Sequence, residues 1–128
     1  MIVLLDTSTP ICRLTLVNGD VRTHDEWQAD RTLAKNLLKY LEEKLAEQGS
    51  AFKDISGIGV MKGPGSFTGL RIGITVLNTI ADANTAPIVG ETGEDWQEKA
   101  LARLSNGEND KVVLPEYGRE ANITTPRK

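Results

Sequence analysis

Cysteine and histidine are almost absent from this 128-residue chain, which contains one of each, Cys12 and His24. One cysteine permits no internal disulfide, and these two residues cannot form the clusters that bind zinc. We therefore expect no disulfide and no metal site. Cys12 lies in an alternating apolar segment and is expected to be buried, whereas the polar neighbours of His24 favour a surface position.

An excess of positive charge and a long apolar run are also missing. The net charge is −3, so a nucleic-acid binder that works through bulk charge is not favoured. No basic segment precedes the apolar residues 2–5, and no later stretch is apolar enough to cross a bilayer. We expect no signal peptide, no membrane contact and a cytoplasmic location. The length fits one domain, residues 1–128.

Apolar periodicity and turn residues divide the chain into strands and helices. Strands are expected at 2–5, 11–17, 21–27, 55–61, 86–90 and 111–114, and helices at 30–47, from the glycine-rich turn to 84, and at 94–104. Asn18-Gly19-Asp20 is a hairpin signal, so the first three strands should form an antiparallel meander. Asp30 and Gly49 are the expected N-cap and stop of the first helix. This order predicts an α/β domain with helices packed on a mixed sheet.

Apolar spacing gives the first and third helices one buried face each. The first helix should bury Leu33, Leu37, Leu38, Leu41 and Leu45, and the third Trp96, Ala100, Leu101 and Leu104. We expect both faces to pack on the sheet.

The stretch from Gly63 to Gly73, GPGSFTGLRIG, is the most informative part of the chain. It follows a strand, opens a helix and contains four glycines. Glycine loses the most backbone freedom on folding, so such a turn is expected where the backbone passes close to another group. The helix that follows is apolar on nearly every side, through Phe67, Leu70, Ile72, Ile74, Val76, Leu77 and Ile80. A chain of this size has little with which to cover a helix that is apolar all round.

Gly69 and Gly73 have two interpretations. Their spacing of four places them on one helix face, where small residues let another backbone approach closely. That backbone belongs either to this chain's own sheet or first helix, or to a helix of a second molecule. On the second interpretation, Gly73→Glu abolishes partner binding while the fold survives.

A phosphate site is a further possibility, because glycine turns before helices bind phosphate through backbone N–H groups. Gly63 to Gly69 lacks the lysine-serine pair of a P-loop and the spacing of the dinucleotide fingerprint. Asp6-Thr7-Ser8 is either a turn that holds a metal-bound phosphate or an ordinary capped turn. Ser66 has no evident base, since the single histidine is His24, and we expect no serine hydrolase.

Two motifs in this order resemble the TsaB (YeaZ) family: Leu4-Leu5-Asp6-Thr7-Ser8-Thr9, and Gly63 to Gly73 after a strand. The leucine pattern of residues 33–45 and the segment Ala86 to Gly90 also fit that family's first lobe. Pro115 to Arg119 is similar to its closing segment. The resemblance covers residues 1–90 and implies an actin-like (ASKHA, ribonuclease H-like) single lobe with a mixed five-stranded sheet.

The resemblance also implies a function in making threonylcarbamoyladenosine in tRNA. In that family the protein is the non-catalytic scaffold of a paralogue, TsaD, which transfers the threonylcarbamoyl group. A TsaE-like ATPase joins the complex, the protein is a homodimer when alone, and tRNA is an indirect partner. We accordingly expect no catalytic residue and no cofactor.

The resemblance also implies which residues form the sites, by their positions in the matching motifs. The pairing surface comprises Leu38, Gly65, Ser66, Phe67, Thr68, Gly69, Arg71, Gly73, Val76, Leu77 and Ile80, and the vestigial phosphate loop comprises Asp6, Thr7 and Ser8. A typical family member has a whole second lobe, whereas only residues 91–114 separate Gly90 from the closing segment here. We therefore expect residues 1–90 to be the first lobe and residues 91–128 a truncated remnant of the second lobe with the closing segment. Without that lobe no cleft would bury ATP.

Two other functions compete with the scaffold. One is a nucleotide-binding ATPase or kinase-like enzyme, and the other is a homodimeric adaptor that uses the same helix surface for another partner. Stabilisation by ATP with magnesium would favour the first, because a ligand that binds the folded state raises stability. Mass in solution, with and without the paralogue, separates the scaffold from the adaptor.

Overall fold

The first three strands form the antiparallel half of the sheet. In the computed structural model, which describes residues 1–117, these are β1 (Ile2–Asp6), β2 (Ile11–Asn18) and β3 (Val21–Gln28). Gly19 has a φ of +65° in the turn between β2 and β3, a conformation that glycine adopts at no steric cost. The predicted meander and its hairpin are confirmed.

The parallel half of the sheet follows through one helical crossover. β4 (Gly57–Met61) pairs with β1, α2 (Phe67–Asn84) crosses over, and β5 (Ile88–Glu91) pairs with β4, which gives the order β3-β2-β1-β4-β5. The remaining helices are α1 (Leu33–Glu47), α3 (Trp96–Ser105) and the short 3₁₀ turns η1 (Asp30–Thr32) and η2 (Phe52–Asp54). The expected mixed five-stranded α/β sheet is confirmed, with strand and helix ends shifted by at most three residues.

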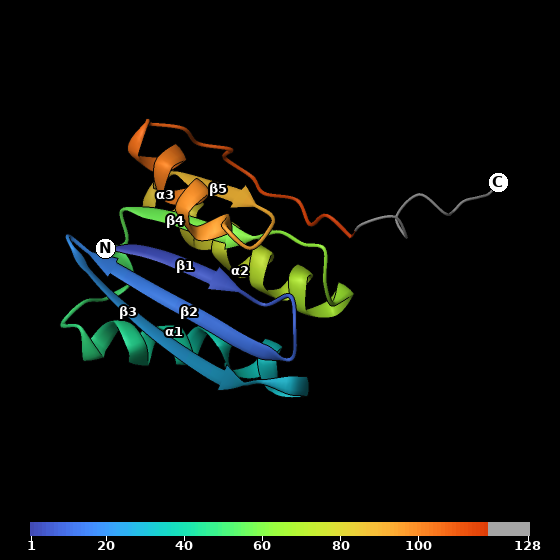
Figure 1. Cartoon of the computed structure of the whole chain (residues 1–128). Helices are drawn as coiled ribbons and strands as arrows, with labels where there is room; N and C mark the ends of the chain where they lie inside the picture. The colour runs from blue at the N-terminus through green and yellow to red at the C-terminus, as the bar shows by residue number, and fades with distance from the viewer. Residues whose placement is uncertain (118–128) are drawn as a thin grey trace.

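The helices cover opposite faces of the sheet (Figure 1). Val3 and Leu5 face α1 and α2 in the larger apolar cluster, whereas Leu4 faces α3 in a smaller cluster with Trp96 and Ala100. Because side chains alternate along a strand, both faces of β1 are apolar, as expected for a central strand with helices on both sides.

The start of α1 differs from the prediction. Asp30 is not the N-cap: it has a φ of +47°, and the helix begins at Leu33 after Thr32, which makes no side-chain cap. The N–H groups of Ala29 and Asp30 both donate to the Pro10 carbonyl oxygen, at 3.1 Å each. These bonds tie the end of β3 to the β1–β2 turn, so the chain reverses there in a 3₁₀ turn. The predicted stop is confirmed, since Gly49 has a φ of +73°.

Leu38 and the last strand are the other corrections. Leu38 does not join the buried face of α1: its side chain is 54% exposed, and Tyr40 is buried instead. The segment 111–114 lies beside β5 but is not a strand, because side chains of Asn109 and Asp110 take the N–H groups of Ile88 and Gly90. These N–H groups of β5 are therefore not available for backbone hydrogen bonds to residues 111–114, so the segment does not pair as a sixth strand.

Candidate functional site

The two sequence motifs meet in space, and the meeting explains the glycines. A Cβ on Gly65 would lie 2.5 Å from the Ser8 Cβ, and a Cβ on Gly69 or Gly73 would overlap atoms of Thr7. The glycine-rich turn and the first turns of α2 therefore pack directly on the β1–β2 turn. Of the two interpretations of Gly69 and Gly73, the structure shows the intramolecular one, with Thr7 as the group that approaches.

Hydrogen bonds fasten this contact. The Thr7 hydroxyl donates to the Gly69 carbonyl oxygen at 2.7 Å, and the Ser66 N–H donates to the Ser8 carbonyl oxygen at 2.8 Å. The Ser8 hydroxyl and N–H both donate to Asp6 Oδ1, at 2.6 and 2.8 Å. Thr7 is fully buried. The turn Asp6–Ser8 is thus a capped turn whose polar groups hold α2, and both of its hydroxyl groups already donate within the chain.

Ser66 caps α2 rather than standing beside a base. Its hydroxyl accepts a hydrogen bond from the Gly69 N–H at 3.3 Å. His24 lies on β3, where its ring contacts the Thr15 hydroxyl at 2.8 Å. Cys12 is buried, and burial together with Asp6 and Asp25 raises the pKa of its thiol to about 12. Within residues 1–117 these three side chains therefore form no nucleophile–base pair.

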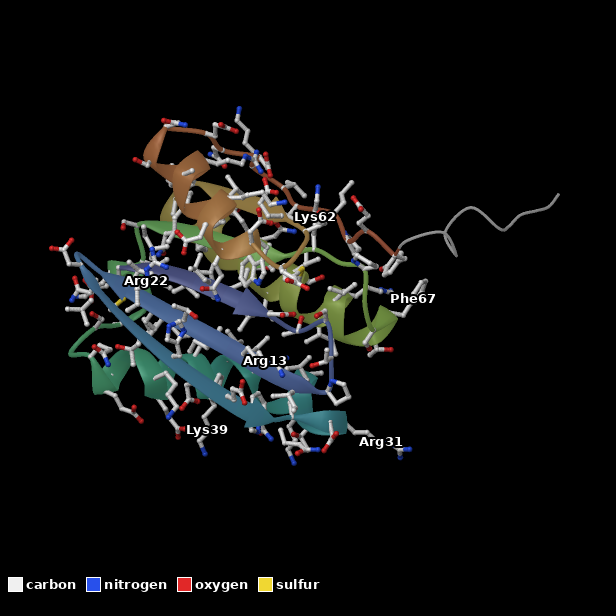
Figure 2. The ribbon with its side chains drawn as sticks, in the orientation of Figure 1. Arg13, Arg22, Arg31, Lys39, Lys62 and Phe67 are labelled. Carbon is white, nitrogen blue, oxygen red and sulfur yellow. The ribbon has the colours of Figure 1, made fainter. Side chains whose placement is uncertain are left out.

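Part of the expected pairing surface faces outward. Leu38 and Phe67 are 54% and 55% exposed, and the other exposed members are Gly65, Ser66, Thr68 and Arg71. Figure 2 shows Phe67 and Arg31 at the same end of the molecule, with Lys39 further along α1. These side chains belong to the outer surface that α1 and α2 share, which we call the α1/α2 face.

Two adjoining hollows mark this face. One, of about 460 Å³, is lined by Ala34, Thr68, Arg71, Ile72, Thr75 and Val76. The other, of about 630 Å³, shares Thr68 and Ile72 with the first and extends to η1 and the β1–β2 turn. Ala34 and Thr75 were not among the expected site residues, although their helical spacing from Leu38 and Ile72 places them on the same side.

Most of the remaining expected members point inward. Gly73, Leu77 and Ile80 are buried and Gly69 packs on Thr7, whereas Val76 is half-buried and lines the hollow between α1 and α2. A glutamate at Gly73 would overlap the Thr7 side chain, so Gly73→Glu would disrupt the fold and cannot isolate partner binding. Helix α2 thus has a packed inner side and an outer side that this chain leaves partly uncovered.

An aromatic pair extends the α1/α2 face beyond the helices. The ring of Tyr117 stacks on that of Phe67, with 3.9 Å between ring centroids. Tyr117 belongs to the closing segment of the family resemblance, whose last residues, Gly118 and Arg119, lie outside the described part of the chain. No local pattern in the sequence predicts that this segment meets the start of α2.

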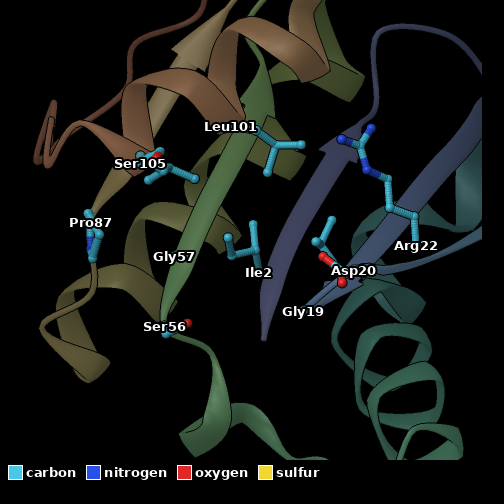
Figure 3. A pocket seen from close by; sticks show the side chains of 11 residues that line it. Ile2, Gly19, Asp20, Arg22, Ser56, Gly57, Pro87, Leu101 and Ser105 are labelled. Carbon is cyan, nitrogen blue, oxygen red and sulfur yellow. The ribbon is translucent and has the colours of Figure 1, made fainter.

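A separate hollow lies on the opposite face of the sheet (Figure 3). It measures about 510 Å³, and its apolar side chains are Ile2, Val17, Pro87, Leu101 and Leu104. Arg22 on its rim pairs with Glu98 at 2.6 Å; that hydrogen-bonded pair raises the pKa of Arg22 and lowers that of Glu98. Residue spacing alone did not predict this hollow.

Two other kinds of feature are absent from the part of the chain that the structure describes. No group of three or more histidine, cysteine, aspartate or glutamate side chains in residues 1–117 is arranged to hold a metal ion. Likewise, none of the helices within that range combines the length and apolarity needed to span a bilayer.

Known proteins resemble this chain over most of its length. A family model described as TsaD, tRNA N6-adenosine threonylcarbamoyltransferase, matches residues 27–93. The tRNA threonylcarbamoyladenosine biosynthesis protein TsaB of Haemophilus influenzae is 31% identical over 82% of this chain, and that of Escherichia coli is 34% identical over 94%. The solved structure of YeaZ from Pseudomonas aeruginosa superimposes with a TM-score of 0.69 at 29% identity, over 83% of this chain.

These relatives are longer than this chain. It spans 44% of the Haemophilus protein, 56% of the Escherichia protein and 49% of the solved Pseudomonas chain. The matched half holds the sheet with its flanking helices, and the actin-like fold that the sequence analysis expected is confirmed by this structural likeness.

Proposed function

The chain belongs to the TsaB (YeaZ) family, and we propose that it is a non-catalytic subunit in the synthesis of threonylcarbamoyladenosine in tRNA. In this proposal it binds a TsaD-like catalytic paralogue through the α1/α2 face. The observation that carries the proposal is the exposure of Leu38 and Phe67, each four residues along its helix from a residue that lines the hollow, Ala34 and Arg71 respectively. Exposed apolar side chains grouped around a hollow are typical of surfaces that bind another protein.

The chemistry of the described residues supports a non-catalytic function. Ser66 caps a helix, Cys12 is buried as a neutral thiol, and His24 contacts Thr15. The Thr7 and Ser8 hydroxyl groups at the phosphate-loop position donate to atoms of this chain. Side chains engaged in this way support a binding subunit rather than an ATPase or kinase-like enzyme.

The wider assembly follows the family. We propose a homodimer through the same face when the paralogue is absent, a TsaE-like ATPase as a further partner, tRNA as an indirect partner and the cytoplasm as location. We further propose that residues 1–90 correspond to the first lobe of the family and residues 115–119 to its closing segment.

The test is the mass of a mixture of this protein with the TsaD-like paralogue of its own organism, measured by size exclusion with light scattering. We expect a one-to-one complex. Leu38→Asp should weaken the affinity at least tenfold, since a central apolar contact is worth more than ~1.4 kcal/mol. Val21→Asp is the matched control, because Val21 is 62% exposed and lies at the β2–β3 hairpin.

Each outcome decides something. Equal affinities of the two variants would move the binding site away from the α1/α2 face. If the wild-type protein stays a homodimer when the paralogue is added, the scaffold function is contradicted and the adaptor function is favoured.

A further inference from the structure

Residues 109–117, here called the strap, connect the edge of the sheet with the start of α2 (Figure 1). The strap begins at β5. The Asp110 N–H donates to the Ile88 carbonyl oxygen at 2.8 Å, and the carboxylate of Asp110 accepts from the Gly90 N–H at 3.0 Å. The side chain of Asn109 accepts from the Ile88 N–H at 3.1 Å. Side chains thus attach the strap to the edge strand.

Asn78 of α2 holds the middle of the strap. Its side-chain amide donates to the Val113 carbonyl oxygen and accepts from the Val113 N–H, both at 2.9 Å. Val113 itself is 3% exposed, and a Cβ on Gly90 would lie 2.5 Å from its side chain. One side chain therefore satisfies both polar groups of a buried strap residue, and removing it would leave them unpaired.

The end of the strap reaches the glycine-rich turn. The Glu116 N–H donates to the Lys62 carbonyl oxygen at 2.6 Å, and the Glu116 carbonyl oxygen occupies the space that a Cβ on Gly63 would need. Gly63 has a φ of +128°, so the position is restricted to glycine both by its backbone and by this contact. The next residue, Tyr117, stacks on Phe67.

This path links Asn78 to the α1/α2 face. Phe67 is 55% exposed even with Tyr117 stacked on it, so more than half of the residue's surface stays open to a partner. In the described part of the chain, the aromatic ring stacked on it is that of Tyr117, which the strap supplies. A ring held against a second ring loses less conformational entropy on binding than a free one.

We propose that the strap holds Phe67 and the Gly63–Phe67 turn in place for partner binding, and that Asn78 is the positioning residue. The aromatic pair then fits an apolar side chain of the partner, because both rings offer apolar surface beside the hollow between α1 and α2. The identity of the partner rests on the proposed function, but the effect of the strap on the turn does not.

The experiment compares Asn78→Ala with Asn84→Ala. Asn84 lies on the same helix, and its amide also bonds to backbone carbonyl oxygens, those of Phe52 and Ile55, at 2.6 and 3.3 Å. Both variants lose a half-buried amide of α2, but Asn78 alone of the two contacts the strap. Amide hydrogen exchange of Ser66 and Leu70 reports on the turn, since these N–H groups donate to the Ser8 and Ser66 carbonyl oxygens. Affinity for the TsaD-like paralogue reports on binding.

We expect the Ser66 and Leu70 amides to exchange about tenfold faster in Asn78→Ala than in Asn84→Ala. Urea unfolding measures the loss of global stability in each variant, and the exchange rates are compared after correction for that loss. The ring-current shift of the Phe67 protons should also shrink. If Asn78→Ala does not fold, Tyr117→Leu removes the stacked ring, keeps an apolar side chain and should give the same changes.

Equal exchange at these amides in the two asparagine variants, with an unchanged Phe67 signal, would overturn the strap proposal. Partner affinity should fall at least fivefold in Asn78→Ala and stay near wild type in Asn84→Ala. If wild-type protein does not bind the paralogue at all, the proposed function fails, while the exchange comparison still decides whether the strap positions the turn.

Discussion

The inner and outer sides of α2 are built from similar small and apolar residues, yet their surroundings are opposite. On the inner side, Gly73 packs on Thr7 and Leu77 is fully buried. On the outer side, Phe67 is half exposed, and Ile72 and Val76 line an open hollow. A helix with apolar residues all round is therefore not buried all round in this chain.

The difference implies that the two sides of one helix serve stability and binding separately. The inner side is fixed by contacts that this chain supplies, so a substitution there should change stability. The outer side makes fewer contacts within the chain, so a substitution there should change binding and leave stability nearly unaltered.

The largest effect is expected at Leu77. Leu77→Ala removes a fully buried side chain and leaves a cavity, so the free energy of unfolding should fall by about 2–5 kcal/mol. Leu38→Ala on the outer surface of α1 should change it by less than ~0.5 kcal/mol, because that side chain is 54% exposed. Urea unfolding followed by circular dichroism measures both. Similar losses in the two variants would contradict the division into packed and open sides.

Gly73 offers a sharper test of the inner contact. Gly73→Ala should cost about 1–3 kcal/mol, since its methyl group would overlap the Thr7 side chain. Thr7→Ala removes the overlapping atoms, together with the hydroxyl that bonds to Gly69. In the double variant the two costs should therefore be less than additive, and a double-mutant cycle on unfolding free energies measures the coupling. Additive costs would mean that Gly73 is needed for another reason.

Local sequence signals predicted most of the fold. The meander, α1, β4 and α2 each have their own periodicity and turn residues, and the structure confirms them with small shifts at the ends. The expected burial of Cys12 in the alternating segment is confirmed, and Leu14 and Leu16 lie with it in the larger cluster. Such elements depend on neighbours a few residues away, so the sequence is enough to place them.

Contacts between residues far apart in the chain could not be predicted from local sequence patterns. The glycine spacing indicated a close approach but could not identify Thr7, whose hydroxyl bonds to Gly69 across 62 positions. The same limit explains the error at residues 111–114, since Val113 is held by Asn78, 35 positions earlier. Periodicity also could not tell that Leu38 would lie outside the buried side of α1, because the position of α2 decides which neighbouring residues are covered.

The contact between the strap and β5 should make the stability of the protein depend on pH in the acid range, through Asp110. Burial disfavours the charged form of Asp110, but hydrogen bonds from Arg103 and the Gly90 N–H outweigh it and lower its pKa below the ordinary value of 3.8. A carboxyl group with a lowered pKa in the folded state stabilises it above its unfolded pKa, and this stabilisation is lost as pH falls through the folded pKa. Stability should therefore fall more steeply below pH 3.8 in wild type than in Asp110→Asn.

Glu108→Gln is the matched control, because Glu108 also pairs with Arg103, at 2.7 Å, but is more exposed. Unfolding free energies from urea titrations across the acid range provide the measurement. If Asp110→Asn and wild type lose stability in parallel below the ordinary pKa, the carboxylate of Asp110 does not hold the strap to β5.

The smallest effect on stability is expected at Cys12. This thiol lies in the cluster that the inner side of α2 completes, and its pKa is raised to about 12, first by burial and then by Asp6 and Asp25. A raised pKa means that its contribution to stability is complete below the unfolded pKa and is lost only as pH rises above about 8.5.

At pH 8 the folded protein should react with a thiol reagent at least ~100-fold more slowly than the urea-unfolded chain, because the thiolate is the reactive species. Leu77→Ala should speed the reaction through more frequent opening, whereas Leu38→Ala should not. Rapid reaction of the wild-type protein would mean that water reaches the larger apolar cluster, to which the inner side of α2 contributes, and that the cluster is not packed as described.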